Sequence, residues 1–344
     1  MTRITHAIAA ACRPRAATTK LALAFALLAS ASALGCVGPL QEATVVHGWP
    51  RHPSGHGLGQ ATGVDVDLHG HVFVFHRAHR DFDYPPPPGL IAEDTVMMFD
   101  PDSGQQLAAW GADRFSIPHG LDVDDQGNVW VTDVGLHQVL KFSHDGELLQ
   151  TWGVAGEPGD DREHLGLPTD VVVLPDGSFY VADGYENSRV VRFSPTGEFV
   201  ATWGTRGSGP GQFAVPHGIA WDGDALLYVA DRGNRRVQAF GLDGTFEFAW
   251  VADELGRPYG IDVAPSGELV VIDGGDLPAT GPDRSRVVIL SPEGEIRATL
   301  GAFGSQDGQF RLGHDVAVGD DGTIYVVDAW GRRVQKFVGA TFHE

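Results

Sequence analysis

The fold is decided by four short segments that follow one another in the chain: Gly120-Leu-Asp-Val123, Val129-Trp-Val-Thr-Asp133, Gln138-Val-Leu-Lys-Phe142 and Leu148-Leu-Gln-Thr-Trp-Gly153. In each segment apolar residues alternate with polar ones or form a short block, as they do in β-strands. Turn residues such as Asp145-Gly146 separate the segments, which is typical of hairpins. The four segments therefore predict one antiparallel unit of four short strands.

This unit is repeated along the chain, with copies that begin near residues 61, 118, 168, 216, 258 and 313. The spacing lies in the range that is typical of propellers and solenoids. The copies open with Ala61-Thr-Gly-Val-Asp65, Pro118-His-Gly-Leu-Asp122, Pro168-Thr-Asp-Val-Val172, Pro216-His-Gly-Ile-Ala220, Pro258-Tyr-Gly-Ile-Asp262 and Gly313-His-Asp-Val-Ala317. We therefore predict an all-β protein, a six-bladed β-propeller.

The last copy lacks its fourth strand, because the chain stops soon after Phe337. Earlier copies end this strand with a dipeptide such as Trp110-Gly111 or Trp152-Gly153. A matching piece, Thr44-Val-Val-His-Gly-Trp-Pro50, lies near the N-terminus. We predict that it supplies the outer strand of the last blade, which would remove the exposed edge of an open ring. Residues 37–344 then form a single propeller domain.

Residues 1–36 are typical of a secretory leader, with basic residues followed by the apolar stretch Leu21–Leu34. Ala33-Leu-Gly-Cys36 is similar to a bacterial lipoprotein cleavage site, so we expect a secreted or periplasmic protein, either anchored by a lipid on Cys36 or released. Cys12 and Cys36 are the two cysteines, so no disulfide can brace the propeller. The formal net charge of −21 argues against nucleic acid as a partner.

Histidine occupies the second position of the opening segment in alternate copies, as His119, His217 and His314. In a ring of six units, alternate copies are related by roughly three-fold symmetry, so the three imidazoles would point at one spot on the axis. Three imidazoles and one open position form the ligand set of a catalytic zinc site. The alternative is a polar lining of the channel without a metal.

The repeats resemble NHL repeats in Tyr228-Val-Ala-Asp-Arg-Gly-Asn-Arg-Arg-Val-Gln-Ala-Phe240. A closer resemblance is to the peptidyl-α-hydroxyglycine α-amidating lyases, and its matches extend from residue 60 to 340. The most specific stretches are Val74-Phe-His-Arg77, Gly127-Asn-Val-Trp-Val-Thr-Asp-Val-Gly-Leu-His-Gln-Val139, Ala182-Asp-Gly-Tyr-Glu-Asn-Ser-Arg189 and Gly211-Gln-Phe-Ala-Val-Pro-His217.

This resemblance implies roles for individual residues. The zinc ligands of the family fall on the three histidines of the repeat. Its catalytic arginine and tyrosine fall on Arg77 and Tyr185, and a further arginine of the active site on Arg232. A structural calcium ion, bound through two backbone carbonyls and one carboxylate, would use Val64, Leu121 and Asp315.

The resemblance also implies an activity. The protein is expected to be a zinc-dependent carbon–nitrogen lyase that acts as a monomer. Its substrate would be a peptide or acylamide ending in α-hydroxyglycine, and its products the C-terminal amide and glyoxylate. Two alternatives remain: a propeller hydrolase of lactones or phosphoesters, and a non-catalytic NHL scaffold that binds a protein or glycan at the cell envelope. The hydrolases usually hold an axial calcium with Glu, Asn and Asp, whereas this axis offers His and Thr.

A second column of the repeat carries Asp after the second strand, in Asp133, Asp183, Asp231, Asp273 and Asp328. We predict that this carboxylate binds backbone amides. The first copy has His76-Arg77 instead, so we interpret Arg77 as a residue with a functional and not a structural role. The neighbouring His69, His71, His76 and His79 are interpreted as parts of an exposed strand and loop.

Overall fold

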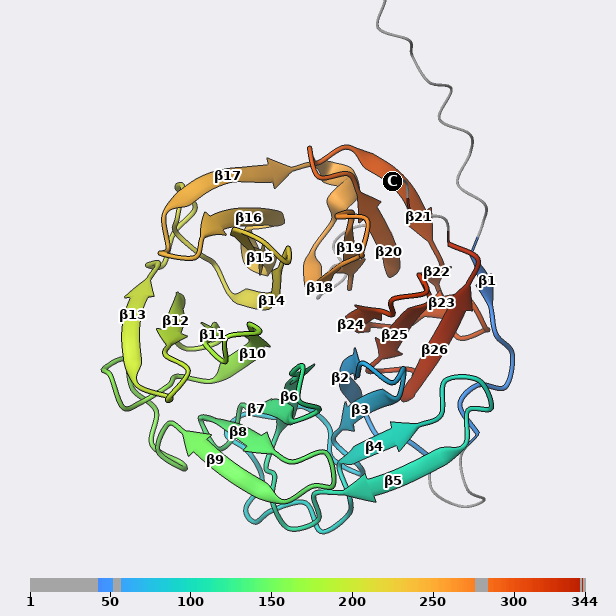
Figure 1. Cartoon of the computed structure of the whole chain (residues 1–344), viewed down its shortest axis with the longest axis horizontal. Coiled ribbons are helices and arrows are strands. Elements are labelled where there is room, and N and C mark those ends of the chain that lie inside the picture. The colour runs from blue at the N-terminus through green and yellow to red at the C-terminus, as the bar shows by residue number, and fades with distance from the viewer. Residues whose placement is uncertain (1–42, 52–56, 276–283, 341, 343–344) are drawn as a thin grey trace, which may run out of the picture. The chain divides into compact units, whose positions relative to one another are not determined.

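The computed structural model describes residues 43–51, 57–275, 284–340 and 342. The predicted leader, residues 1–36 with the two cysteines, lies outside the described residues. The described part of the chain forms six four-stranded antiparallel sheets and one two-stranded parallel ribbon. In Figure 1 the six sheets are arranged around a central axis as the blades of a propeller, which confirms the predicted fold. Among the described residues, no helix is long and apolar enough to cross a membrane.

The bounds of the strands follow the predicted repeat. The inner strands are β2 (Ala61–Val66), β6 (Pro118–Val123), β10 (Pro168–Val173), β14 (Pro216–Trp221), β18 (Pro258–Val263) and β24 (Gly313–Val318). The second strands are β3 (Val72–His76), β7 (Val129–Asp133), β11 (Phe179–Asp183), β15 (Leu226–Asp231), β19 (Leu269–Asp273) and β25 (Ile324–Asp328). The third strands are β4 (Val96–Phe99), β8 (Gln138–Phe142), β12 (Arg189–Phe193), β16 (Arg236–Gly241), β20 (Arg286–Leu290) and β26 (Arg333–Val338).

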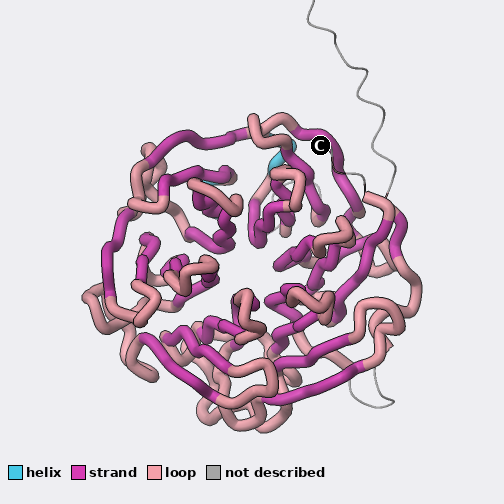
Figure 2. The backbone as a smooth tube through the Cα atoms, viewed as in Figure 1, coloured by secondary structure: helices cyan, strands magenta, loops and turns pink. Residues whose placement is uncertain are grey.

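The outer strands complete each sheet. They are β5 (Gln106–Trp110), β9 (Leu148–Trp152), β13 (Phe199–Trp203), β17 (Phe246–Val251), β21 (Ile296–Leu300) and β1 (Thr44–Val45). The parallel ribbon is β22 (Ala302–Phe303) with β23 (Gln309–Phe310), and two short 3₁₀ helices are η1 (Arg232–Asn234) and η2 (Asp253–Leu255). Blade 1 is β2–β5, and the blades are numbered in chain order up to blade 6, which is β24–β26 with β1. Strands and the loops joining them account for nearly all of the described chain (Figure 2).

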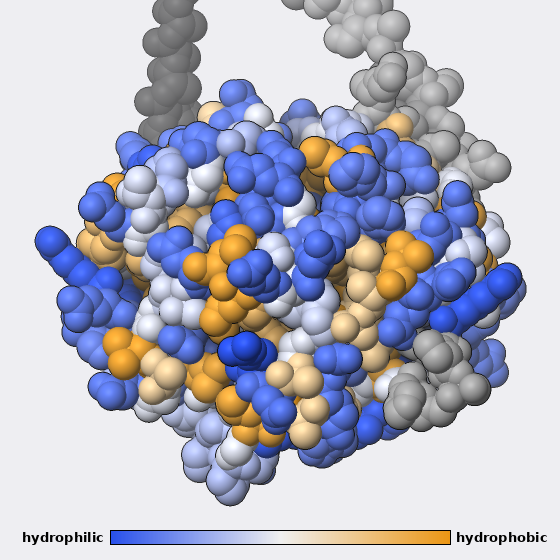
Figure 3. All heavy atoms as spheres, turned by 60° about the horizontal axis from the view of Figure 1, so that its bottom comes forward, coloured by the Kyte–Doolittle hydropathy of each residue, from blue (hydrophilic) through white to orange (hydrophobic). Residues whose placement is uncertain are grey.

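The hydrophobic core lies between neighbouring blades and not inside a single one. Phe73 and Phe75 of blade 1, for example, pack against Val131 and Phe142 of blade 2. Equivalent clusters join each further pair of blades around the ring, including blades 6 and 1. On the face shown in Figure 3, hydrophilic side chains predominate and hydrophobic ones lie in small separate groups. The hydrophobic core therefore consists of the apolar interfaces between neighbouring blades, which are arranged around the axis.

The N-terminal segment closes the ring as predicted. Thr44 pairs with Val338 and Val45 with Phe337, so β1 is the outer strand of blade 6. Trp49 then packs between blades 6 and 1, with its ring 5.1 Å from that of Tyr325. It also covers Gly104 of blade 1, where a Cβ would lie 2.7 Å from the indole. Trp110 covers Gly146 of blade 2 in the same way, so the closing segment repeats the packing of the other blades.

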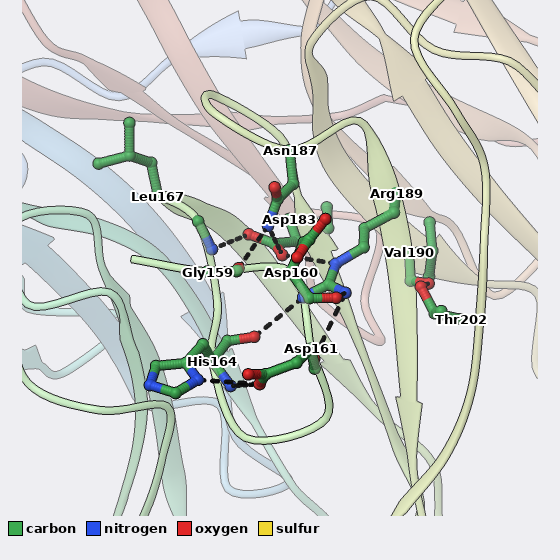
Figure 4. Close-up of polar contacts among 12 residues, drawn as sticks. Gly159, Asp160, Asp161, His164, Leu167, Asp183, Asn187, Arg189, Val190 and Thr202 are labelled. Carbon is green, nitrogen blue, oxygen red and sulfur yellow. Dashed lines mark hydrogen bonds and ion pairs between the residues drawn. The ribbon is translucent and has the colours of Figure 1, made fainter. Parts of the chain in front are cut away.

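The carboxylates of the Asp column bind backbone amides, as predicted, and these amides belong to the same blade. Asp183 accepts the amide of Gly166 at 2.7 Å, which belongs to the segment leading into the inner strand of its own blade. Figure 4 shows the same carboxylate paired with Arg189, whose guanidinium also donates to the carbonyls of Asp160 and His164. In blade 2, Asp133 accepts the amides of Ser116 and Ile117. The carboxylate thus anchors the start of the strand that faces the axis.

In blade 1 this structural role passes to His76. His76 pairs with the first residue of its inner strand, as Asp133 does in blade 2. Its Nδ1 accepts the amides of Gly59 at 3.2 Å and Ala78 at 3.0 Å, and the side chain is buried. The interpretation of His76 as exposed is therefore wrong. Arg77 does not replace the Asp, since it lies one position further on, where blade 4 carries Arg232.

Candidate active site

The three histidines of the repeat meet on the propeller axis. They lie at the second position of β6, β14 and β24, in blades 2, 4 and 6. The distances between ring centroids are 4.8 Å from His119 to His217, 4.7 Å from His119 to His314 and 4.9 Å from His217 to His314. One nitrogen of each ring lies within 4.8 Å of the other two, and all three side chains are buried. The arrangement is close to an equilateral triangle, as the alternation in the repeat predicts.

Each histidine is held by a carbonyl of the next blade. His119 Nδ1 lies 2.6 Å from the carbonyl of Thr169, His217 Nδ1 3.0 Å from that of Tyr259, and His314 Nδ1 2.8 Å from that of Thr62. A carbonyl can only accept, so Nδ1 carries the proton and the lone pair is on Nε2. This contact fixes the tautomer and the ring orientation, in the manner of the outer-shell partners of metal-binding histidines. The Thr and Tyr positions of the repeat thus support the His positions through their backbones.

Burial keeps the three imidazoles neutral. It lowers the pKa of His119 and His217 well below the usual value, with further lowering from the positive charges of Arg77 and Arg232. The pKa of His314 falls to about 3, again mainly through burial. A cavity of about 10 Å³ is lined by the three histidines, and a space of this size holds a single ion or water. Neutral imidazoles around a one-atom cavity suit a borderline metal ion such as zinc.

Tyr185 lies over this triangle. Its phenol oxygen is 3.0 Å from Nε2 of His119 and 3.2 Å from Nε2 of His217, so it adjoins the position that all three rings face. Arg232 Nη1 donates to the same oxygen at 3.3 Å. The guanidinium of Arg232 also packs on the rings of Tyr185 and Tyr259, at 5.1 and 4.7 Å from their centroids. The phenol oxygen of Tyr185 is thus held between two imidazoles and one guanidinium, where it can contact a group bound at the centre of the triangle.

Arg77 approaches the same tyrosine from blade 1. Its Nε donates to the carbonyl of Pro118 at 2.9 Å and its Nη1 to Oε1 of Gln60 at 2.8 Å. Burial lowers its pKa to about 10, while the nearby Tyr185 and Asp133 oppose this shift. Among the described residues, Arg77 Nη2 and Arg232 Nε are buried without a hydrogen-bond partner. Two unpaired guanidinium donors beside the triangle of histidines suit a carboxylate ligand.

Comparison with known proteins gives the same family as the resemblance seen in the sequence. The NHL repeat model matches residues 115–142 and 165–193. Peptidyl-glycine alpha-amidating monooxygenase B of Xenopus laevis is 38% identical over 81% of this chain and 34% of its own length. Peptidyl-alpha-hydroxyglycine alpha-amidating lyase 2 of Drosophila melanogaster is 34% identical over 87% of this chain and 78% of its own length. The chain belongs to the peptidyl-α-hydroxyglycine α-amidating lyase family.

The chain spans about a third of the length of the Xenopus relative, 34%. Among solved structures, a streptogramin B lyase superposes with a TM-score of 0.59 at 13% identity, covering 86% of this chain and 98% of that one. At that identity the superposition supports the propeller fold alone.

In this member of the lyase family the other end of the channel is acidic. Val64, Leu121 and Asp315 all line a cavity of about 180 Å³, together with Asp65, Asp122, Asp170 and Asp262. Burial raises the pKa of Asp122 and Asp170 to about 8, and that of Asp315 well above its usual value. Carboxylate and carbonyl oxygens are the ligands that calcium prefers. The three residues predicted to bind calcium are thus brought together.

Further members of the site lie outside the sequence prediction. Gln60 Oε1 accepts from both Arg77 and the amide of Phe82, and Gln60 Nε2 donates to Asp81 at 2.8 Å. The ring of Phe82 covers the Arg77 guanidinium at 5.0 Å and lies 5.4 Å from the Tyr185 ring. These residues precede and follow the first inner hairpin, where the repeat pattern carries no signal. His137, by contrast, accepts the amide of Leu167 and is not a member of the three-histidine group.

Proposed function

We propose that this protein is a zinc-dependent lyase that cleaves a peptidyl- or acyl-α-hydroxyglycine to the C-terminal amide and glyoxylate. The observation that supports this best is one arrangement: three neutral Nε2 atoms, a phenol oxygen within 3.2 Å of two of them, and two unpaired guanidinium donors. Family membership supplies the reaction class. The zinc, the substrate and the role of each residue are the proposal.

His119, His217 and His314 would hold the ion, since their geometry, burial and tautomer fit a site with three nitrogen ligands and an open position. A bound zinc ion would act as a Lewis acid on the substrate hydroxyl and lower its pKa. The chain itself supplies the carbonyls of Thr62, Thr169 and Tyr259, which keep the imidazoles oriented when the site is loaded or emptied.

Arg77 binds the substrate carboxylate through its free Nη2, while Gln60 and the Pro118 carbonyl fix the plane of its guanidinium. Tyr185 accepts the hydroxyl proton as the carbon–nitrogen bond breaks. The oxygen becomes the aldehyde oxygen of glyoxylate, and the departing nitrogen takes up one proton to become the amide. Arg232 positions the phenol oxygen of Tyr185 for this step, because its Nη1 already donates a hydrogen bond to that oxygen.

We propose a structural calcium ion at the acidic end of the channel, bound by Asp315 and the carbonyls of Val64 and Leu121. Asp315 Oδ2 accepts the amide of Val64, so this carboxylate already bridges blades 6 and 1. Buried carboxylates that repel one another are stabilised by a divalent cation. The ion would therefore support the closed ring and take no part in the chemistry.

From the predicted leader we also propose that the protein is exported, and that the mature chain is either anchored by a lipid on Cys36 or released. Labelling of growing cells with a radioactive or clickable fatty acid separates the two outcomes. Label on the wild-type protein that is lost in Cys36→Ala supports the anchor. Absence of label on exported wild-type protein supports release.

The decisive experiment combines metal analysis with an assay. Purified protein should contain about one zinc per chain at the axis, and should release glyoxylate from N-benzoyl-α-hydroxyglycine and from a peptide ending in α-hydroxyglycine. A chelator should abolish release and added zinc should restore it. If zinc-loaded protein releases no glyoxylate from either substrate, the lyase proposal is wrong and a binding scaffold is favoured.

A further inference from the structure

A second group of histidines lies at the surface, away from the axis. Asp67, His69 and His71 belong to the turn between β2 and β3 of blade 1, and one ligand atom of each lies within 4.8 Å of the others. His144 joins them from the turn between β8 and β9 of blade 2. The site proposed here is defined by these four residues and is called the inter-blade cluster. No step of the proposed lyase reaction uses any of them.

Asp67 is the common neighbour of the three imidazoles in the inter-blade cluster. Asp67 Oδ2 lies 3.0 Å from His71 Nδ1, 3.2 Å from His144 Nε2 and 3.7 Å from His69 Nδ1. Around a tetrahedral ion with bonds of about 2.0–2.1 Å, neighbouring ligand atoms lie roughly 3.3–3.4 Å apart. One carboxylate oxygen thus has three imidazole nitrogens at nearly the edge length of such a tetrahedron. Asp67, His69 and His71 have ligand atoms within 4.8 Å of one another, and His144 joins them through its distance of 3.2 Å to Asp67 Oδ2.

The carboxylate is fixed before any ion arrives. The Asp67 side chain is 1% exposed, and its Oδ1 accepts the amides of His69 at 2.9 Å and His71 at 2.8 Å. These two bonds leave Oδ2 facing the imidazoles. The ring of His144 packs edge-on against Phe73, with centroids 5.4 Å apart, and its side chain is 34% exposed. The carboxylate and one imidazole are therefore held in place.

The remaining two imidazoles give access. His71 is 30% exposed and His69 78% exposed, so an ion can reach the cluster from solvent and His69 can rotate onto it. The cluster is also separate from the active site. Ala61 pairs with His76 at one end of the β2–β3 hairpin, and Val66 pairs with Val72 at the other, so the turn lies at the opposite end from Arg77.

We propose that Asp67, His69, His71 and His144 form a second metal site, for a borderline divalent cation such as Zn²⁺, that links blades 1 and 2. Three imidazoles and a carboxylate are the donors that zinc, nickel and cobalt accept, whereas calcium and magnesium prefer oxygen alone. Because the ligands come from neighbouring blades, the ion would cross-link blades 1 and 2. It would raise the melting temperature without being needed for turnover.

Metal stoichiometry tests this directly. The full mature protein is emptied with a chelator and titrated with Co²⁺, whose visible absorption reports tetrahedral coordination, and then with Zn²⁺ by calorimetry. The wild-type protein should bind two equivalents, and His119→Ala should bind one, with the tetrahedral cobalt spectrum retained. His71→Ala should also bind one equivalent and should release glyoxylate at the wild-type rate.

His79→Ala is the matched control, because His79 lies on the same blade, pairs with the exposed Glu93 and is outside the cluster. It should bind two equivalents. If His71→Ala does not fold, His69→Ala replaces it, since that side chain is mostly exposed. The proposal is overturned if wild-type protein binds a single equivalent that His119→Ala abolishes, or if neither His71→Ala nor His69→Ala lowers the stoichiometry. Failure of the axial site alone would instead leave one equivalent that depends on His71 and not on His119.

Discussion

The axial histidines and the inter-blade cluster are both groups of three imidazoles, but they are built in opposite ways. The axial group takes one residue from each of three alternate blades, buries all of them and fixes every Nδ1 on a carbonyl. The inter-blade cluster takes two histidines from one turn and one from the next blade, and its rings remain partly exposed. An axial site therefore needs the whole ring, whereas the surface cluster needs one seam. This difference predicts how each group of histidines responds to substitution of a ligand or truncation of the chain.

The largest expected effect comes from removing an axial ligand. His314→Ala should lose the zinc that we propose on the axis, and nearly all turnover with it, since catalytic zinc sites use three protein ligands and only two imidazoles would remain. Metal analysis and glyoxylate release measure the two effects. His119→Ala and His217→Ala should behave alike, while His137→Ala, at a histidine that accepts a backbone amide and is outside the three-histidine group, should keep zinc and rate. Axial zinc that survives all three substitutions would place the site elsewhere.

Opening the ring should come next. Deletion of residues 37–50 removes β1 and Trp49, so it exposes the edge of β26 and part of the core between blades 6 and 1. We expect the melting temperature to fall by more than about 10 °C, since a loss of several kcal/mol shifts a domain of this size by that much. The axial metal should be lost before that of the inter-blade cluster. Deletion of residues 37–42, which keeps β1 and Trp49, is the control. Equal stability of the two variants would show that the ring does not depend on β1 for its closure.

Tyr185→Phe separates chemistry from metal binding. The variant keeps the ring over the triangle but loses the oxygen that we propose as the proton acceptor, so turnover should fall by about 10²–10⁴-fold, the usual contribution of a general base. Zinc content should be unchanged, because the three imidazoles and their carbonyl partners are untouched. An unchanged rate would remove Tyr185 from the mechanism.

The smallest effect is expected at Gln60, which positions Arg77. Gln60→Ala removes the acceptor of Arg77 Nη1 and leaves the contact with the Pro118 carbonyl. A hydrogen bond to a charged group contributes about 1.5–3 kcal/mol, so KM should rise about tenfold or more while kcat changes less. Gln126→Ala, at an exposed turn of blade 2, is the control. Equal changes in kcat and KM would argue for a general structural role.

The contrast between the two clusters also explains what the sequence could predict. The repeat aligns equivalent backbone positions, so it predicts the six inner strands, the closing strand and the axial triangle, all of which depend on symmetry. The inter-blade cluster breaks that symmetry, because only two of the turns carry its ligands. Gln60 and Phe82 likewise lie in segments unique to blade 1, and their contacts depend on how that loop packs.

His76 illustrates the same limit on a smaller scale. In the sequence, the replacement of Asp by His looks like the loss of a structural residue. In the fold, the imidazole accepts two amides and does the work of the carboxylate. Residue type predicts which hydrogen bonds are possible, but equivalence of position, set by strand register, decides which are made.

The pairing of β1 with β26 has a consequence for how the protein matures. Thr44 meets Val338, so blade 6 is finished only when the two ends of the propeller have been synthesised and have found each other. Contacts this distant in sequence form late, because closing so long a loop is slow. Blade 6 carries His314, and a partly folded chain therefore presents an incomplete axial triangle. The zinc ion that we propose would therefore find all three of its ligands in place only after the two ends of the propeller have met.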